Sequence, residues 1–230
     1  MYEFGMNVAR GYVEDFQSIH KFGSNLALSG SAESIWSAGG LYPWSSLATA
    51  QTLYFISTDS GDTGTLTVQG LDTNYNSQIK TYTLNGLTAV DSGSDTWLRV
   101  FRMSYADENA GTITARVTSG TGTVVAQIDA AKGQTLMAVY TIPAGFNGYL
   151  LQYTASVGKG DDVNLDLFIR DPAINGFRIK NELKLYEATF TQQFAIPMML
   201  VEKSDIDFRG VTTNPGSDCI VTFDLILDKR

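Results

Sequence analysis

The sequence predicts an all-β fold, an antiparallel β-sandwich or jelly-roll-like domain, from two main observations. Apolar and polar residues alternate through 163–170 and again through 177–185, with a turn segment at 171–176 between them. Successive side chains of a strand point to opposite faces, so this alternation indicates a hairpin with one buried and one exposed face. Further strand-like runs recur at short intervals, and no segment shows sustained helical periodicity.

From residue 51 onward, turn residues separate many of the predicted strands. The pairs Asn85-Gly86, Asn147-Gly148 and Asn175-Gly176 match two-residue hairpin turns, because both residues tolerate positive φ. The last run is apolar on one face and mixed on the other, as expected of a central strand. The predicted strands are 51–57, 64–70, 77–84, 96–104, 111–117, 123–128, 135–142, 148–156, 163–170, 176–187, 190–201, 204–211 and 218–228.

An extended N-terminal arm is predicted over residues 1–12, because apolar residues alternate there at strand spacing. These residues are Tyr2, Phe4, Met6 and Val8. A terminal apolar strand either completes its own sheet or crosses to a neighbouring subunit.

The β-sandwich domain is expected to fill residues 13–230. Its first part, 13–46, is aromatic and glycine-rich and is interpreted as loops held by buried rings. A subdivision near 119–133 would also fit, because that segment begins with a Gly/Thr-rich stretch. A hairpin loop explains the same stretch and is preferred, since strand alternation resumes at once.

Composition limits the classes of function. The 230 residues are 43% hydrophobic, which suffices for a buried core, and only 17% charged, against a typical share of about 25%. The net charge is -8, and no basic stripe is visible, which disfavours binding to nucleic acid or to an anionic membrane. Neither a secretory signal nor a membrane helix is recognisable, so we expect a soluble protein made in a cytoplasm.

Residue types that often carry catalysis are scarce. His20 is the single histidine and Cys219 the single cysteine, so neither an internal disulfide nor a usual zinc site is expected. His20 lies in an alternating stretch without a nucleophile motif and is interpreted as structural. Asp72–Asn76 resembles the start of a calcium loop, but Ser77 replaces the required glycine and Thr83 the required glutamate, which favours a plain turn.

Paired acids are the remaining catalytic candidates. Asp107-Glu108 and Asp161-Asp162 lie in predicted loops. A glycosidase needs two carboxylates across a cleft, whereas adjacent acids point apart on an extended chain. We therefore predict no catalytic residue, no cofactor and no metal site, and a hydrolase is the last-ranked hypothesis.

Some aromatic residues suggest binding. Trp36 and Trp44, with Asp72 and Asn74 nearby, could form a glycan-stacking groove, although core anchoring explains the tryptophans as well. Phe168 and Tyr186 fall on the polar side of the predicted hairpin. Rings in that position are either covered by a second layer or used in contacts with a partner.

Several short stretches carry a family resemblance. Tyr140–Leu150, with the core Ile-Pro-Ala-Gly, resembles the T-V-P-A-G-K-T-x-Y-L turn of tailed-phage structural proteins, with Phe146 and Asn147 replacing Lys-Thr. Other stretches are similar to virion structural proteins of marine tailed phages: His20–Gly23, Glu33–Gly40, Thr67–Asp72, Thr83–Gly86 and Glu202–Ile206. The resemblance implies a place on the virion, as capsid decoration or as a tail component, and supplies no catalytic residues.

The first hypothesis is a non-enzymatic phage virion protein, made in the host cytoplasm and built into the particle as capsid decoration, cement or another surface component. Its expected partners are further copies of itself, in a homo-oligomer such as a trimer, and other virion proteins such as the major capsid protein. The second hypothesis is a carbohydrate- or receptor-binding module of a tail, using Trp36 and Trp44. The interface candidates are Tyr2, Phe4, Met6, Val8, Phe168 and Tyr186.

Overall fold

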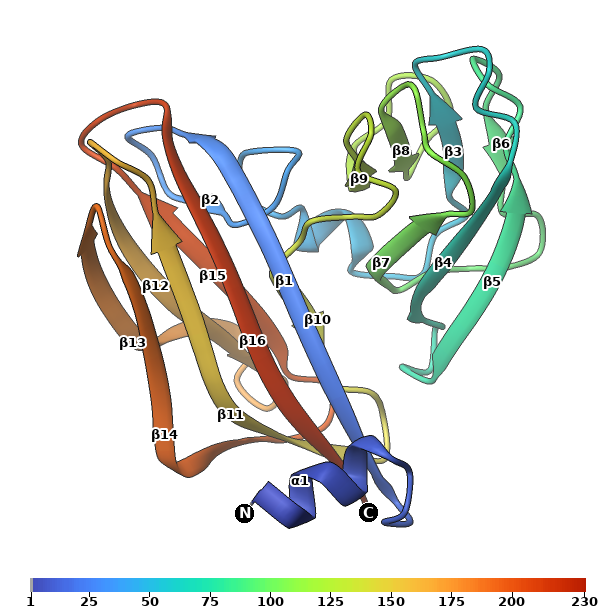
Figure 1. Cartoon of the computed structure of the whole chain (residues 1–230). Coiled ribbons are helices and arrows are strands. Elements are labelled where there is room, and N and C mark those ends of the chain that lie inside the picture. The colour runs from blue at the N-terminus through green and yellow to red at the C-terminus, as the bar shows by residue number, and fades with distance from the viewer. Residues whose placement is uncertain (1) are drawn as a thin grey trace. The chain divides into compact units, whose positions relative to one another are not determined.

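The computed structural model describes residues 2–230, and antiparallel sheets form most of it, which confirms the all-β class (Figure 1). The chain divides into two compact units. Unit 1 comprises the chain up to Ile35 together with Ala138–Arg230, and unit 2 comprises Trp36–Met137. Unit 2 is therefore an insertion in the chain of unit 1. The segment 119–133, where the sequence suggested a subdivision, lies inside unit 2. The units instead divide at the two ends of unit 2.

The described part of unit 1, from residue 2 onward, contains one helix and two sheets. Sheet A has the strand order β1-β16-β11-β14, and sheet B has the order β10-β15-β12-β13, with β2 paired to β15. The elements are α1 (Tyr2–Ala9), β1 (Phe16–Leu28), β2 (Glu33–Ser34), β10 (Val139–Thr141), β11 (Phe146–Val157), β12 (Asp162–Asp171), β13 (Gly176–Tyr186), β14 (Thr189–Leu200), β15 (Asp205–Val211) and β16 (Ser217–Lys229).

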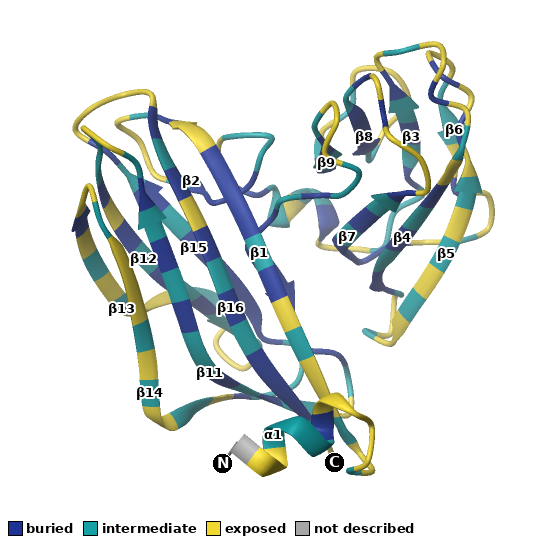
Figure 2. Ribbon diagram, viewed as in Figure 1, coloured by how far each residue is buried: buried dark blue, intermediate teal, exposed yellow. Residues whose placement is uncertain are grey.

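The two sheets of unit 1 pack face to face through aromatic rings. Phe208 of β15 lies 5.0 Å from the ring of Tyr153 on β11 and 5.4 Å from the ring of Phe223 on β16. The Tyr153 hydroxyl donates a hydrogen bond of 2.7 Å to Asn181 Oδ1 on β13. Burial raises the pKa of Tyr153 to about 12. Buried residues alternate with half-buried ones along β11, β12 and much of β16, so each sheet turns one face inward (Figure 2).

The clearest predictions from alternation are confirmed. β12 and β13 form an antiparallel hairpin that closes at Asp171 and Gly176, and Asn175 adopts a positive φ of 46° in the turn. β16 lies between β1 and β11 and is central in sheet A. The prediction of a turn at Asn147-Gly148 is wrong, since both residues lie inside β11. The Ile142 side chain occupies the space that a Cβ at Gly148 would fill, so a larger residue there would require Ile142 to move.

The predicted extended arm is a helix instead. Tyr2–Ala9 forms α1, which lies beside the C-terminal end of β16 (Figure 1). Phe4 and Val8 are four residues apart, so they share one face of a helix as readily as one face of a strand. Phe4 packs edge-to-face on Phe16 at 5.4 Å, and Val8 is buried. Among residues 2–230, no helix has the length and hydropathy needed to cross a membrane.

The region expected to be loops also contains a long strand. β1 spans 13 residues, Phe16–Leu28, and pairs with β16. Its side chains opposite the buried residues of β16 include Gln17, Lys21 and Asn25, so the inward face of β1 is not uniformly apolar. That mixture hid the strand from a search for alternating hydrophobicity.

Unit 2 is built from two smaller sheets, with strand orders β6-β3-β8-β9 and β5-β4-β7. Its core includes the stacked rings of Phe55 and Tyr82, 4.6 Å apart, one from each sheet. Trp97 is fully buried, and its Nε1 donates to the Tyr82 hydroxyl at 3.3 Å. The elements are the 3-10 helix η1 (Trp44–Leu47) and the strands β3 (Tyr54–Ser57), β4 (Thr65–Leu71), β5 (Ser77–Thr83), β6 (Val90–Asp91), β7 (Arg99–Tyr105), β8 (Ile113–Arg116) and β9 (Val124–Ile128).

A buried carboxylate organises the loops of unit 2. Asp62 accepts hydrogen bonds from the Ser57 hydroxyl at 2.5 Å and from the backbone N–H groups of Ala110 and Gly111 at 2.9 Å. Burial acts to raise the pKa of Asp62, but these hydrogen bonds outweigh burial, so its pKa lies below the ordinary value. Asp62 thus holds together loops that are far apart in the sequence.

Candidate functional site

The most unusual surface of unit 1 lies along β13 and β14, the edge strands of sheets B and A. Both strands are exposed along most of their length (Figure 2). Large apolar side chains project from them: Ile196 is 86% exposed, Tyr186 60% and Met199 53%, and Phe190 and Ile179 are also exposed. Several exposed apolar groups on one edge are typical of an interaction surface.

A bulge places Ile196 at the surface. In the pairing of β11 with β14, Leu150 faces Met198 and Gln152 faces Gln193, so Leu151 stands opposite the segment 194–197. The extra residues loop out of the ladder and include Pro197, which cannot donate a backbone hydrogen bond. The segment Thr189–Gln193 beside the bulge keeps regular strand pairing.

The outer face of sheet A carries a row of polar side chains. His20 Nδ1 lies 2.6 Å from Asp224 Oδ1, the Gln152 amide donates to Asp224 Oδ2 at 2.8 Å, and the Gln193 amide donates to Gln152 Oε1 at 3.3 Å. The row crosses all the strands of the sheet from β1 to β14. His20 therefore has a structural partner, as its sequence context predicts, and its side chain is exposed.

Phe168 and Tyr186, the rings predicted to face outward, have different surroundings. The Arg209 guanidinium lies over the Phe168 ring at 4.3 Å and over the Phe177 ring at 4.7 Å, and Arg209 Nε donates to Asp207 at 2.8 Å. Phe168 is thus partly covered by cation–π packing. Tyr186 remains 60% exposed beside the Lys184 ammonium. Tyr186 is consequently the better placed of the two for contact with a partner.

The arm residues are only partly available for contact. Phe4 is 44% exposed, Met6 is half-buried and Val8 is buried. The side chain of Tyr2 lies outside the described residues. An interface role for α1 therefore rests on Phe4 and stays a prediction.

The tryptophans proposed for glycan stacking belong to an aromatic cluster in unit 2. Trp36 is 3% exposed, and its Nε1 donates to the Gly40 carbonyl at 3.0 Å. A ring buried to this extent offers no face to a sugar, so the structure does not support a platform that includes Trp36. Trp44 is half-buried, and the Arg99 guanidinium lies over it at 5.3 Å. Glycan stacking stays a prediction for Trp44 alone.

The acidic candidates serve the loops in which they lie. Asp72 accepts hydrogen bonds from the backbone N–H groups of Asn74 and Asn76, as expected for a turn. Asp162 accepts from Thr213, and Asp161 accepts from the backbone of Asp218. Asp107 and Glu108 are exposed. Among residues 2–230, no group of three or more His, Cys, Asp or Glu side chains is arranged to hold a metal ion.

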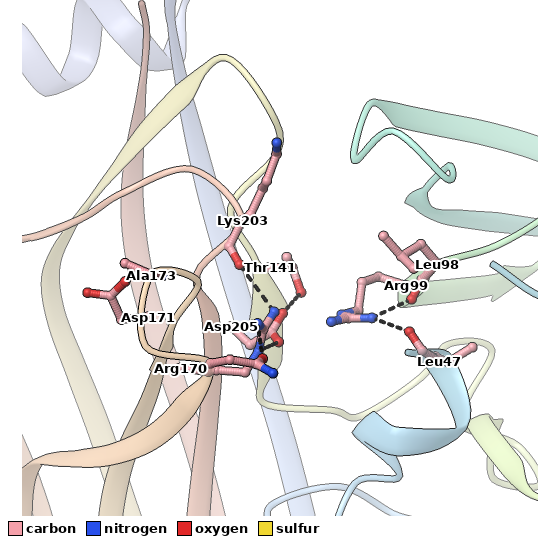
Figure 3. Close-up of polar contacts among 10 residues, drawn as sticks. Leu47, Leu98, Arg99, Thr141, Arg170, Asp171, Ala173, Lys203 and Asp205 are labelled. Atoms are coloured by element: carbon pink, nitrogen blue, oxygen red, sulfur yellow. Dashed lines mark hydrogen bonds and ion pairs between the residues drawn. The ribbon is translucent and has the colours of Figure 1, made fainter. Parts of the chain in front are cut away.

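Sequence reasoning missed the buried ion pair of sheet B (Figure 3). Asp205 is fully buried; Arg170 Nε donates to its Oδ2 and the Thr141 hydroxyl to its Oδ1, both at 2.5 Å. Arg170 also donates to Asn175 and to the Lys203 carbonyl. The one available signal was Arg170 at the end of an alternating strand, and it reads equally well as an exposed charge.

Sheet B also carries two facing carboxylates whose negative charges are poorly compensated by nearby positive charge. Asp166 of β12 faces Glu182 of β13 directly, and like charges in that position destabilise a sheet. Burial and then the Glu182 carboxylate raise the pKa of Asp166, although Arg209 acts to lower it. The folded state therefore holds this proton more tightly than the unfolded state, and stability falls as the pH rises through the raised pKa.

We predict that Asp166→Asn stabilises unit 1 by roughly 0.5 kcal/mol at neutral pH, because it removes the repulsion between facing carboxylates. The gain should vanish at acidic pH, where both carboxyl groups are protonated. Chemical denaturation at the two pH values measures the effect. Glu182→Gln should give a similar gain, and an equal gain at both pH values would contradict the explanation.

Comparisons with known proteins leave the family open. No protein-family model matches the chain, and no curated protein matches it. A solved structure of infectious bursal disease virus, Gx strain, is 8% identical and covers 94% of this chain and 76% of that chain, with a TM-score of 0.23. A mutant VP2 protein of the same virus, from derived T=1 particles, is 8% identical and covers 94% and 74%, with a TM-score of 0.20. Neither similarity is high enough to carry a conclusion about fold or function.

Proposed function

We propose that this chain is a non-enzymatic structural protein of a virion, with capsid decoration or cement as its first assignment. The observation that carries the proposal is the strand order of unit 1. The strands of unit 1 can be numbered along the chain, leaving out the two-residue β2. Neighbouring strands in sheet A are then the first, eighth, third and sixth, and those in sheet B are the second, seventh, fourth and fifth. We infer that this order is a jelly roll, an architecture common in viral capsid domains.

The use of the polar side chains supports a structural role. The Arg170–Asp205 pair joins β12 to β15, Arg209 of β15 packs on the rings of Phe168 and Phe177, and the Asp62 network joins loops of unit 2. Asp72, considered as a calcium ligand, and Asp161 and Asp162, considered for catalysis, instead accept hydrogen bonds within turns and between loops. A particle protein needs such rigidity, because its contacts with neighbouring subunits depend on fixed surfaces.

The proposed partners are further copies of the chain and a major capsid protein. The edge strands β13 and β14 support the first of these, because Tyr186, Phe190 and Ile196 are exposed on them. Burial of such groups against a neighbour is favourable by the hydrophobic effect. The resemblance to marine tailed-phage virion proteins is the ground for placing the chain on a phage particle.

The test is the protein composition of purified particles of the phage that encodes the chain. We expect the chain to sediment with the particles, at a copy number that quantitative mass spectrometry relates to the major capsid protein. A replication enzyme from the same genome serves as a control that should remain in the soluble lysate. If the chain also stays in the lysate, the proposal is wrong. Antibody labelling in the electron microscope then distinguishes heads from tails.

A further inference from the structure

β14 is a long sheet edge that lacks the usual protection against pairing. It spans 12 residues, Thr189–Leu200, and none of them is charged. Natural proteins usually place charges on exposed edge strands to prevent pairing with other chains. β13 follows that rule, with exposed Arg178, Lys180, Glu182 and Lys184. Among the described residues β14 pairs with β11 alone, so its other edge is open to a strand from outside.

The direction of the backbone groups identifies the open positions. The Val157 N–H donates to the Ala188 carbonyl at 2.9 Å, next to the facing pair Ser156 and Thr189. Backbone groups in an antiparallel pair alternate between facing the partner and facing away. The backbone groups of Phe190 and Gln192 therefore face β11, as those of Ala188 do. The N–H and C=O groups of Thr189, Thr191 and Gln193 point to the open edge.

The side chains at the open positions line one face of the sheet. The hydroxyls of Thr191 and Thr154 are 2.9 Å apart, as are those of Thr189 and Ser156. All three open residues, Thr189, Thr191 and Gln193, are exposed. The Gln192 amide donates to the Gln193 carbonyl at 3.0 Å, a weak cap that an incoming N–H can replace.

We propose that β14 pairs with β14 of a second copy of the chain, antiparallel, about a two-fold axis at Thr191. In this register Thr191 faces Thr191 of the second copy, and Thr189 faces Gln193. The open backbone groups are then matched on both strands without any shift, and sheet A continues from one copy into the next. The proposal deepens the assembly role proposed above and rests on it.

A second copy fits this edge better than an unrelated strand for two reasons. The three open positions are spaced symmetrically about Thr191, so the edge is complementary to itself, as a two-fold contact requires. The absence of charge also removes repulsion between identical strands that would face each other closely. Phe190, exposed in the single chain, is covered in the pair by Gln192 of the second copy.

Charge placement tests both the contact and its register. In the proposed register, Thr189→Lys combined with Gln193→Lys places lysine opposite lysine twice, and the dimer should be lost. Thr189→Lys combined with Gln193→Glu places lysine opposite glutamate twice, and the dimer should persist. Sedimentation of the purified full chain measures each mass, with the dimer expected at twice 25.0 kDa.

Thr191→Pro provides an independent variant. It removes the N–H that points to the open edge and the exposed hydroxyl contact with Thr154, but no backbone hydrogen bond to β11, so pairing with β11 is kept while the dimer should be lost. Thr81→Lys, on the exposed edge strand β5 of unit 2, is the matched control and should leave the mass unchanged. Circular dichroism checks that each variant is folded.

A wild-type chain that sediments as a monomer would overturn the proposal, as would a dimer that survives Thr189→Lys with Gln193→Lys. Loss of the dimer in both double variants would overturn the register. A monomer that binds an extended peptide from another virion protein would assign the edge to that protein instead. Absence of the chain from particles would count against the proposed function only, since sedimentation uses the purified chain.

Discussion

Asp205→Ala is expected to destabilise unit 1 by about 3–5 kcal/mol, the cost of removing one partner from a buried ion pair. Asp205 is fully buried and accepts from both Arg170 and Thr141 at 2.5 Å. Its loss removes the carboxylate partner of the largely buried Arg170 guanidinium. The effect should exceed that of any exposed ion pair in the chain.

The chain supplies separate probes for measuring this effect. Cys219, the single cysteine, lies in unit 1 and is buried, and all three tryptophans lie in unit 2. Burial first, and then the Asp218 carboxylate, raise the pKa of Cys219 to about 12, so the folded thiol should react slowly. Asp205→Ala should therefore lower the denaturant concentration at which Cys219 becomes reactive, and shift the tryptophan emission transition less.

Arg230→Ala is the matched control for Asp205→Ala. Arg230 pairs with Glu202 at 3.5 Å, and both side chains are substantially exposed, so its loss should have little effect on stability. Asp205→Asn keeps the shape of the side chain but removes its charge, and should fall between the two. A shift in Asp205→Ala no larger than that in Arg230→Ala would show that the buried pair contributes little.

The strands of this protein could be predicted where burial differs between the two faces of a sheet. β12 gave a clear two-residue period because one side of it lies over the core, and β16 was recognised as central because it is apolar on a full face. β13 shows the same period in its sequence, although most of its residues are exposed or half-buried. β1 was not found because Lys21 and Asn25 occupy inward positions. Those positions depend on partners far away in the sequence, which a local pattern does not contain.

The helix α1 and the interaction surface show a second limit. An apolar residue at every second position over a short segment also places Phe4 and Val8 on one helical face, so the pattern alone cannot choose between strand and helix. Tyr186 was identified because it breaks the alternation of its strand. The open edge of β14 was not, because whether a strand is an edge depends on topology. The lack of charge in 189–200 was visible, but it is equally typical of a buried strand.

Gly70→Ala is the second large effect that we predict, roughly 3 kcal/mol of destabilisation in unit 2. A Cβ at Gly70 would overlap the carbonyl oxygen of Arg99 and would lie 3.0 Å from Trp97 Cε3. Both obstacles are rigid: one is backbone of β7, and the other is a fully buried ring. The pairing of β4 with β7 already shifts register between Gln69 and Gly70, so the strands approach too closely for any side chain.

Cys219 reactivity and tryptophan emission again measure the effect, and we now expect the larger shift in the tryptophan transition. Gly70→Ala should lower the denaturant midpoint of the tryptophan transition more than that of Cys219 reactivity, because Trp97 lies against the altered residue. Gly30→Ala is the control: its added methyl group meets only the Thr212 carbonyl oxygen, at 3.8 Å, and should be tolerated. If Gly70→Ala were as stable as Gly30→Ala, the close approach of β4 and β7 would be wrong. The stability of unit 2 would then not depend on the register shift at Gly70.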